Sequence, residues 1–290
     1  MGKVMKIDYT LHTHTVGFDG RNTAQEMVET AVSRGFNTIG FSNHFIVHPN
    51  IKKSKMYKYA VLGGYSNIYS DNIEQTINLF KPHYDNVRAL REEYPNMNIL
   101  CGMEMDYFSY PNWVENMRYA VRELQPDYII GAMHFMDMGD DILNIHDIKN
   151  AGAPESGRLL REYYQNLMRL AEFDWRNTGF RFNWIAHFDL PQKIGLSCPD
   201  MEVAAMQALR MNSVPIELNT SLIKNPRYTL NPAAMGEIKN MPVVISDDAH
   251  GIGRRGADFD EICEMAKSAG AQNICTSAAN LGRIVKVRGR

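Results

Sequence analysis

Short apolar runs alternate with amphipathic stretches along most of the chain. Each apolar run predicts a strand. The expected strands lie at 6–11, 37–42, 98–105, 127–135, 182–190, 214–219 and 241–247, with a further short candidate at 272–277. Stretches of helical spacing separate them, at 23–35, 71–94, 111–124, 157–173, 199–212, 232–240 and 257–269. Residues of about 48 to 70 are polar and aromatic without a clear period.

Several helix boundaries carry local signals. Thr23 and Glu26 have the spacing of a capping box, and Gly35 follows as a stop signal. Pro111 and Pro199 stand at expected first helical positions, where their missing N–H has no cost. Pro82 lies inside the stretch 71–94 and predicts a kink or a break there.

This alternation predicts an α/β fold. About seven strand–helix units require parallel strands joined by crossover helices, and strands that are apolar on both faces fit a covered sheet. Seven or eight such units in 290 residues favour a closed β/α barrel over an open sheet. No stretch rich in Gly, Pro or Ser divides the chain, so we expect one domain over residues 1–290.

Composition narrows the range of partners. The net charge is −2, which argues against nucleic-acid binding through a broad basic field. No apolar stretch approaches the roughly 18 residues of a membrane helix, and the N-terminus has no signal-peptide pattern. The four cysteines form no C-x-x-C pair, so neither a zinc ribbon nor a disulfide scaffold is indicated. We expect a cytoplasmic protein that binds neither nucleic acid nor membrane.

Histidines and acids gather where the predicted strands end. In a β/α barrel the functional groups lie at the carboxyl ends of the strands. Six of the nine histidines fall at such ends, and scattered surface histidines would have no reason to share one rim. With three acids, the candidates are His12, His14, Asp19, His44, Glu104, His134, His187, Asp248 and His250.

Imidazoles mixed with carboxylates are ligands that suit Zn²⁺, Mn²⁺ or Fe²⁺. Nine candidates at four or five per ion predict two or three metals, with the two oxygens of Glu104 as the natural bridge. The candidates include no thiolate, so we expect an open site that keeps a water or hydroxide, as a hydrolytic centre requires.

The ordered motifs HTH (12–14), DG (19–20), SNH (42–44), GMEMD, GAMH, AHFDL and SDDAH resemble the polymerase-and-histidinol-phosphatase (PHP) superfamily. They extend from Leu11 to His250. A chain of this length is most similar to the monofunctional histidinol-phosphate phosphatases of histidine biosynthesis. That resemblance implies a distorted (β/α)7 TIM-like barrel with a trinuclear metal site. The segment of about 48–97 matches it least and is a candidate wall of the substrate pocket.

The resemblance also implies a division of the ligands. His12, His14, Glu104 and Asp248 would hold one ion, and Glu104 would bridge to a second ion completed by His134 and His187. Asp19, His44 and His250 would hold a third. Some members of the superfamily have histidine where this chain has Asp19.

A phosphomonoester dianion resists attack by an anion, so its hydrolysis needs charge neutralisation. By hypothesis the nucleophile is a hydroxide shared by two metals, and no serine or cysteine nucleophile is needed. Lys193, Arg227 and Arg254 follow strand ends and are candidates for the substrate phosphate, although a solvated surface charge is the alternative for each. Asp106 and Asp189 follow ligands at i+2 and are placed to orient histidines.

Other functions remain open at this point. A related PHP enzyme would cleave a nucleotide or another small phosphomonoester with the same metals. An amidohydrolase-type enzyme also has H-x-H after its first strand, but it typically has a modified lysine on strand four, where this chain has Met133 and His134. A metal-binding protein without catalysis is the third alternative. The sequence leaves the oligomeric state open.

Overall fold

The computed structural model describes residues 6–173, 178–220, 231–254 and 258–277 of the chain. Within these residues a ten-stranded sheet follows the order β1-β2-β5-β6-β9-β10-β11-β12; β3 branches from β5, and β4 pairs with β3. All pairs in this sheet are parallel; β7 and β8 form a separate antiparallel hairpin. The strands are β1 (Tyr9–Thr10), β2 (Thr38–Phe41), β3 (His44–Val47), β4 (Tyr69–Ser70), β5 (Asn98–Asp106), β6 (Tyr128–Ala132), β7 (Phe135–Asp137), β8 (Ile142–Asn144), β9 (Trp184–Ile185), β10 (Ile216–Asn219), β11 (Pro242–Ser246) and β12 (Asn273–Ile274).

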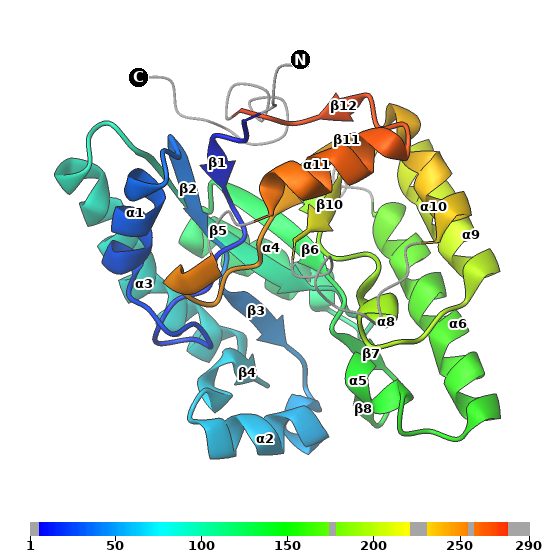
Figure 1. The fold of residues 1–290 in the computed structure, drawn as a ribbon. Coiled ribbons are helices and arrows are strands. Elements are labelled where there is room, and N and C mark those ends of the chain that lie inside the picture. Colours follow the sequence, from blue (N-terminus) through cyan, green and yellow to red (C-terminus); the bar gives the residue numbers. More distant parts are fainter. Residues whose placement is uncertain (1–5, 174–177, 221–230, 255–257, 278–290) are drawn as a thin grey trace.

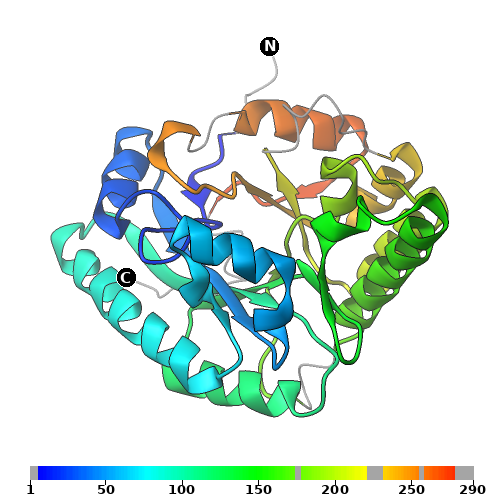
Figure 2. The same ribbon diagram turned by 90° about the horizontal axis from the view of Figure 1, so that it is seen from below.

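Helices surround the curved sheet, as the view in Figure 2 shows. They connect successive parallel strands, which is the arrangement that the alternating pattern predicts. The α-helices with known bounds are α1 (Ala24–Ser33), α2 (Lys55–Gly63), α3 (Ile73–Glu93), α4 (Trp113–Leu124), α5 (Ile145–Ile148), α6 (Ala153–Ala171), α8 (Leu190–Lys193), α9 (Pro199–Met211), α10 (Pro232–Gly236) and α11 (Phe259–Ser268). The 3-10 turns are η1 (Ile51–Lys53), η2 (Ser66–Ile68), η3 (Glu237–Asn240) and η4 (Ile252–Arg254). No described helix combines the length and apolar character needed to cross a bilayer.

The first and last parts of the sheet meet and close the distorted barrel. Thr13, just beyond β1, forms a parallel bridge with Ala249, just beyond β11. The His14 N–H donates to the Ala249 carbonyl at 3.0 Å, and the Ala249 N–H donates to the His12 carbonyl at 3.0 Å. This confirms the distorted α/β barrel that the sequence predicts.

Tyr128 packs in the interior of the barrel with its hydroxyl buried. The Tyr128 hydroxyl donates to the Leu11 carbonyl, and its ring lies against Trp184 with the centroids 5.2 Å apart. A Cβ added to Gly102 would lie 2.1 Å from the Tyr128 ring, so a residue without a side chain is needed there. The ring therefore packs directly against the β5 backbone, just below the ligand-bearing ends of the strands.

Several sequence-based boundaries were wrong. Strand two ends at Phe41, and His44 instead begins β3, which pairs with β5 in the register His44 to Glu104. Only Trp184–Ile185 of the expected strand 182–190 is hydrogen-bonded as a strand, and α4 begins at Trp113, beyond Pro111. Buried apolar residues continue beyond the hydrogen-bonded part of these strands, so the hydrophobic pattern predicts strands that are too long.

Two helical predictions have clear outcomes. Thr23 and Glu26 form the predicted reciprocal capping box of α1. Pro82 does not interrupt α3, which runs from Ile73 to Glu93.

The stretch 48–70, for which no period was found, contains η1, α2, η2 and β4. In Figure 1 this segment forms the lower end of the molecule.

Candidate metal centre

All nine predicted ligand side chains lie at one rim of the barrel, although they come from seven separate stretches of the chain. His12 and His14 follow β1, His44 begins β3, and Glu104 lies in β5. His134, His187, Asp248 and His250 lie beyond the ends of β6, β9 and β11. Contacts within 3.7 Å connect these eight side chains and Asp19 into one cluster.

One group of atoms lies between the two N-terminal histidines and two acids. Glu104 Oε2 is 3.4 Å from His12 Nε2 and 3.7 Å from His14 Nε2. Asp248 Oδ1 is 3.5 Å and 3.2 Å from the same two nitrogens. Four ligands at about 2.05 Å around a tetrahedral Zn²⁺ would be about 3.3 Å from one another. The four histidine–carboxylate distances therefore match the spacing of ligands around one cation.

The other oxygen of Glu104 faces a second group. Glu104 Oε1 is 2.9 Å from His187 Nε2 and 3.5 Å from His134 Nε2. The two oxygens thus face different imidazoles, as a bridging carboxylate requires. His44 also contacts this carboxylate, because its Nδ1 is 2.8 Å from Glu104 Oε2.

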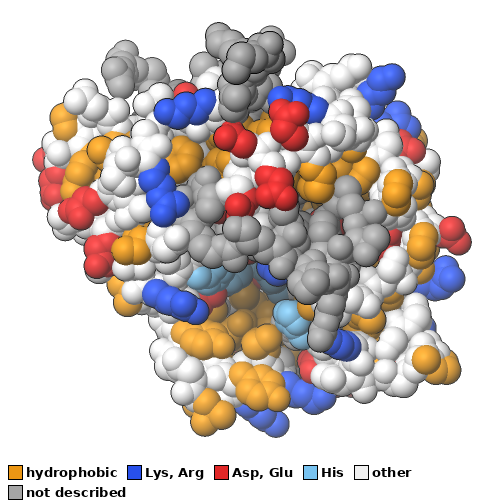
Figure 3. Space-filling model, in the orientation of Figure 1, with side chains coloured by type: hydrophobic (Ala, Val, Ile, Leu, Met, Phe, Trp, Pro, Cys, Tyr) orange, Lys and Arg blue, Asp and Glu red, His pale blue; other side chains and the backbone are white. Residues whose placement is uncertain are grey.

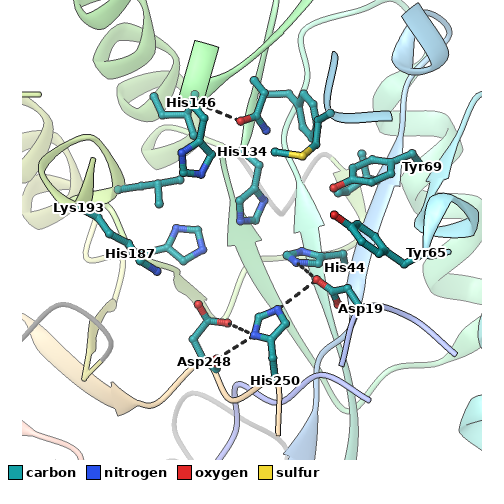
Figure 4. A pocket seen from close by; sticks show the side chains of 16 residues that line it. Asp19, His44, Tyr65, Tyr69, His134, His146, His187, Lys193, Asp248 and His250 are labelled. Atoms are coloured by element: carbon teal, nitrogen blue, oxygen red, sulfur yellow. Dashed lines mark hydrogen bonds and ion pairs between the residues drawn. The ribbon is translucent and has the colours of Figure 1, made fainter. Parts of the chain in front are cut away.

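A third group surrounds Asp19, as the dashed lines of Figure 4 show in part. Asp19 Oδ2 is 3.2 Å from His44 Nε2 and 3.1 Å from His250 Nε2. The His14 ring stacks on the His250 ring at 4.1 Å and brings its Nδ1 to 3.4 Å from Asp19 Oδ1. This aspartate therefore accepts contacts from three imidazoles.

Several buried atoms of the cluster have no hydrogen-bond partner among the described residues. They are His12 Nε2, both nitrogens of His14, His44 Nδ1, Asp19 Oδ1 and Glu104 Oε2. An unsatisfied buried polar atom typically costs about 1–3 kcal/mol. Bound metal ions would satisfy these atoms, so the residues present fit a metal centre.

The electrostatics favour cation binding as well. Burial alone would raise the pKa of Glu104, but His44, His12 and His134 outweigh it and hold that pKa well below its usual range. His12 is buried too, yet Glu217 and Glu104 raise its pKa well above the ordinary value. The cluster therefore keeps ionised carboxylates among imidazoles at neutral pH.

Two of the predicted ligands have uncommon backbone conformations. His187 has φ +23° and Asp248 has φ +45°, in the region that non-glycine residues rarely occupy. Such a conformation typically costs about 1–3 kcal/mol and is found most often at functional sites. These two loops are held so that their side chains point to the rim.

Acidic residues contact the outer nitrogens of two histidines. Asp106 Oδ2 is 2.9 Å from His134 Nδ1, as the i+2 spacing predicted. The contact between His12 Nδ1 and Glu217 Oε2, at 2.7 Å, was missed. The sequence contained a signal for Glu217: it lies two residues before Asn219, so both side chains share one face of the expected strand 214–219. Asp189 is the buried N-cap residue of α8, and its predicted role toward a histidine stays a prediction.

A cavity of about 350 Å³ opens above the cluster. In Figure 3 the histidines are visible inside a hollow of the surface. Met56, Tyr65 and Tyr69 line it, so the segment 48–97 does contribute a pocket wall. Figure 4 shows the two tyrosines on one side of the pocket, and His146 and Lys193 on the other. Sequence reasoning did not identify these tyrosines or His146.

The three predicted phosphate contacts differ in outcome. Lys193 ends α8 and lines the cavity, and its contact with a phosphate stays a prediction. Arg254 belongs to η4, and its side chain lies outside what the structure describes. Arg227 lies outside the described residues altogether.

Comparisons with known proteins agree with this architecture. The family model named PHP domain matches residues 8–221. A Listeria monocytogenes structure with the provisional name histidinol phosphatase matches with a TM-score of 0.68 and 17% identity, over 88% of this chain and 100% of that one. Lactococcus lactis subsp. lactis histidinol phosphate phosphatase, solved with zinc, L-histidinol and phosphate, matches at 0.65 and 17%, over 94% and 97%. At 17% identity, these two similarities show the fold of this chain and nothing further. No curated protein sequence matches the chain.

Proposed function

This chain belongs to the PHP domain family, and on that premise we propose that it hydrolyses a small phosphomonoester at a metal centre. The proposed reaction converts L-histidinol phosphate to L-histidinol and inorganic phosphate, a step of histidine biosynthesis. The observation that carries the proposal is the arrangement of Glu104, whose two oxygens face different imidazoles at the floor of an open cavity.

The proposed ligands fall into three sets. His12, His14, Glu104 and Asp248 form the first, Glu104, His134 and His187 the second, and Asp19, His44 and His250 the third. Divalent ions held there (Zn²⁺, Mn²⁺ or Fe²⁺) would supply hydroxide at neutral pH and neutralise charge on the phosphoryl oxygens. Two or three ions can be held, since the second and third sets offer three residues each.

The chain itself orients the ligands and the substrate. Asp106 accepts from the backbone N–H of His134 at 2.7 Å and contacts its Nδ1, which fixes the ring with Nε2 toward Glu104. Lys193 is proposed to bind a phosphate oxygen, and Arg227 and Arg254 stay candidates for the same role. The cavity wall of Met56, Tyr65 and Tyr69 is proposed to enclose the leaving group.

The choice of substrate is supported by the two similar folds named above. The Lactococcus lactis phosphatase was solved with the two products of histidinol phosphate hydrolysis. A cavity of about 350 Å³ can hold a molecule of that size. A cytoplasmic location is part of the proposal, because a biosynthetic phosphatase works where its substrate is made.

A phosphate-release assay tests this function. The substrates are L-histidinol phosphate, AMP and two sugar phosphates, each measured with added Zn²⁺ or Mn²⁺ and after chelation. We expect the highest kcat/KM for L-histidinol phosphate. A clear preference for AMP or a sugar phosphate would contradict the specific substrate and support the alternative PHP phosphoesterase. Bound metal without turnover of any phosphoester would instead favour a metal-binding protein.

A further inference from the structure

A buried carboxylate lies beneath the metal centre and outside the proposed ligand sets. Glu217 is on β10, its side chain is fully buried, and its Oε2 is 2.7 Å from His12 Nδ1. Burying a carboxylate is unfavourable unless hydrogen bonds and charges compensate for the lost water. Trp184 Nε1 donates to the same oxygen at 3.2 Å, and Asn219 Nδ2 donates to the other at 3.3 Å.

These contacts determine how the His12 ring can act. Trp184 and Asn219 are donors, so the carboxylate is an acceptor, and the His12 nitrogen facing it carries hydrogen as a donor. In the neutral ring the free lone pair is then on Nε2. That nitrogen is buried, has no hydrogen-bond partner among the described residues and lies 3.4 Å from Glu104 Oε2 and 3.5 Å from Asp248 Oδ1.

The carboxylate is itself held by rigid packing. The Trp184 ring stacks on Tyr128 with an interplanar angle of 13°. The Tyr128 hydroxyl in turn donates to the carbonyl of Leu11, the residue before His12. Both the ring of His12 and its backbone are thus fixed by the same interior cluster.

We propose that Glu217 is a positioning residue that holds His12 in the form that binds the first metal ion. The inference rests on the proposed ligand sets. With this role for Glu217, a ligand histidine on each side of Glu104 is oriented by a carboxylate. Glu217 orients His12, and Asp106 orients His134. Such partners of metal-binding histidines typically contribute 10- to 100-fold in metal affinity.

Glu217→Gln tests this role, because it keeps the side-chain shape and removes the charge. Zn²⁺ affinity is measured by competition with a coloured chelator, and unfolding is followed in the metal-free protein. Glu202→Gln is the matched control: Glu202 is also buried and accepts three hydrogen bonds, but from Ser197, Cys198 and Asn231, away from the rim.

We expect Glu217→Gln to weaken binding of one Zn²⁺ by 10- to 100-fold and excess Zn²⁺ to restore activity. Glu202→Gln should bind Zn²⁺ as the unaltered chain does. Trp184→Phe removes one donor to Glu217 and keeps an aromatic ring at this position. It should weaken binding of the same ion less, and it decides the question if Glu217→Gln does not fold.

Unchanged Zn²⁺ affinity in folded Glu217→Gln would overturn the inference, and so would an unaltered chain that binds no Zn²⁺. The measurements of Zn²⁺ affinity and of unfolding need no substrate. If the unaltered chain binds Zn²⁺ but does not cleave L-histidinol phosphate, the proposed function fails and the role of Glu217 is still decided.

Discussion

Glu104 is the residue on which the proposed centre depends most. It is fully buried, and its oxygens contact five different histidines of the rim: His12, His14, His44, His134 and His187. A carboxylate in this position provides a negative charge and a bridge at once. No other described acid of the cluster contacts as many imidazoles.

Glu104→Ala should therefore lose most of the bound metal, because both the first and the second ligand set lose an oxygen. We expect phosphate release to fall by about 100-fold or more, since removal of a ligand exceeds the 10- to 100-fold effect of an outer partner. Metal content is measured by elemental analysis alongside activity. Glu202→Ala is the control; a Glu104→Ala protein with normal metal content would show that the bridging assignment is wrong.

Lys193 allows a test of substrate binding that leaves the metals in place. Its side chain lines the cavity beside the cluster. Lys193→Gln should raise KM for the phosphomonoester by about 10-fold, the effect of losing a charged hydrogen bond of about 1.5 kcal/mol, with metal content unchanged. Lys58, exposed on α2, gives the control variant Lys58→Gln. An unchanged KM would remove Lys193 from the site.

Most of the residues that the sequence predicted share one property: they lie at or just beyond the end of an expected strand. His12, His14 and Glu104 could be found because an imidazole or acid at that point interrupts an apolar run. Glu217 was missed because its role comes from a contact 205 residues away, with His12. Tyr65 was missed because a tyrosine in a polar loop has many ordinary explanations.

Elements that show a clear helical or strand periodicity were predicted. The short elements of the stretch 48–70 were not. The stretch 48–70 forms several short elements, which are too brief to show a helical or strand period. Its capping residues were the available signal: Ser54 accepts from the Tyr57 N–H at the start of α2, and Gly64 ends it with φ +78°. A search for caps would have located α2 without any periodicity.

Helix α3 connects to the ligand loops through one histidine. Asn43 Nδ2 donates to His83 Nε2 at 3.0 Å, while Asn43 Oδ1 accepts from the Thr15 N–H at 2.8 Å. Thr15 and Asn43 are the neighbours of His14 and His44. Burial lowers the pKa of His83 to about 4, so it stays neutral and accepts this hydrogen bond.

This pKa predicts loss of stability in acid. In the unfolded chain His83 takes a proton near its ordinary pKa of 6.5, and in the folded chain only near 4. The unfolded state therefore binds more protons between these values, and the free energy of unfolding falls as pH drops from about 6.5 to 4. The contribution of His83 is up to about 3 kcal/mol.

His83→Gln should reduce this acid sensitivity, because glutamine offers an oxygen to Asn43 and takes no proton. Urea unfolding of the metal-free variant and of the unaltered chain, at pH 7 and pH 4.5, gives the comparison. We expect the variant to lose less stability between the two values. Equal losses in both proteins would show that His83 is not kept neutral by the fold.

At the scale of the whole molecule, barrel closure brings distant ligands together. His12 and Asp248 lie at opposite ends of the chain, and the bridge between Thr13 and Ala249 places them side by side. The count of strands and helices predicted a barrel, because short parallel connections allow few other arrangements. The register of closure was not predictable, since it depends on side-chain packing inside the barrel, such as Tyr128 against Trp184.

The central claim is that this rim is a metal-dependent phosphatase centre. Its most direct test is a reconstitution titration, in which the chelated protein receives Zn²⁺ or Mn²⁺ while bound metal and L-histidinol phosphate hydrolysis are measured together. The account predicts no hydrolysis after chelation and full recovery once two to three equivalents are bound. Hydrolysis that persists in metal-free protein, or three bound equivalents without recovery of any hydrolysis, would contradict it.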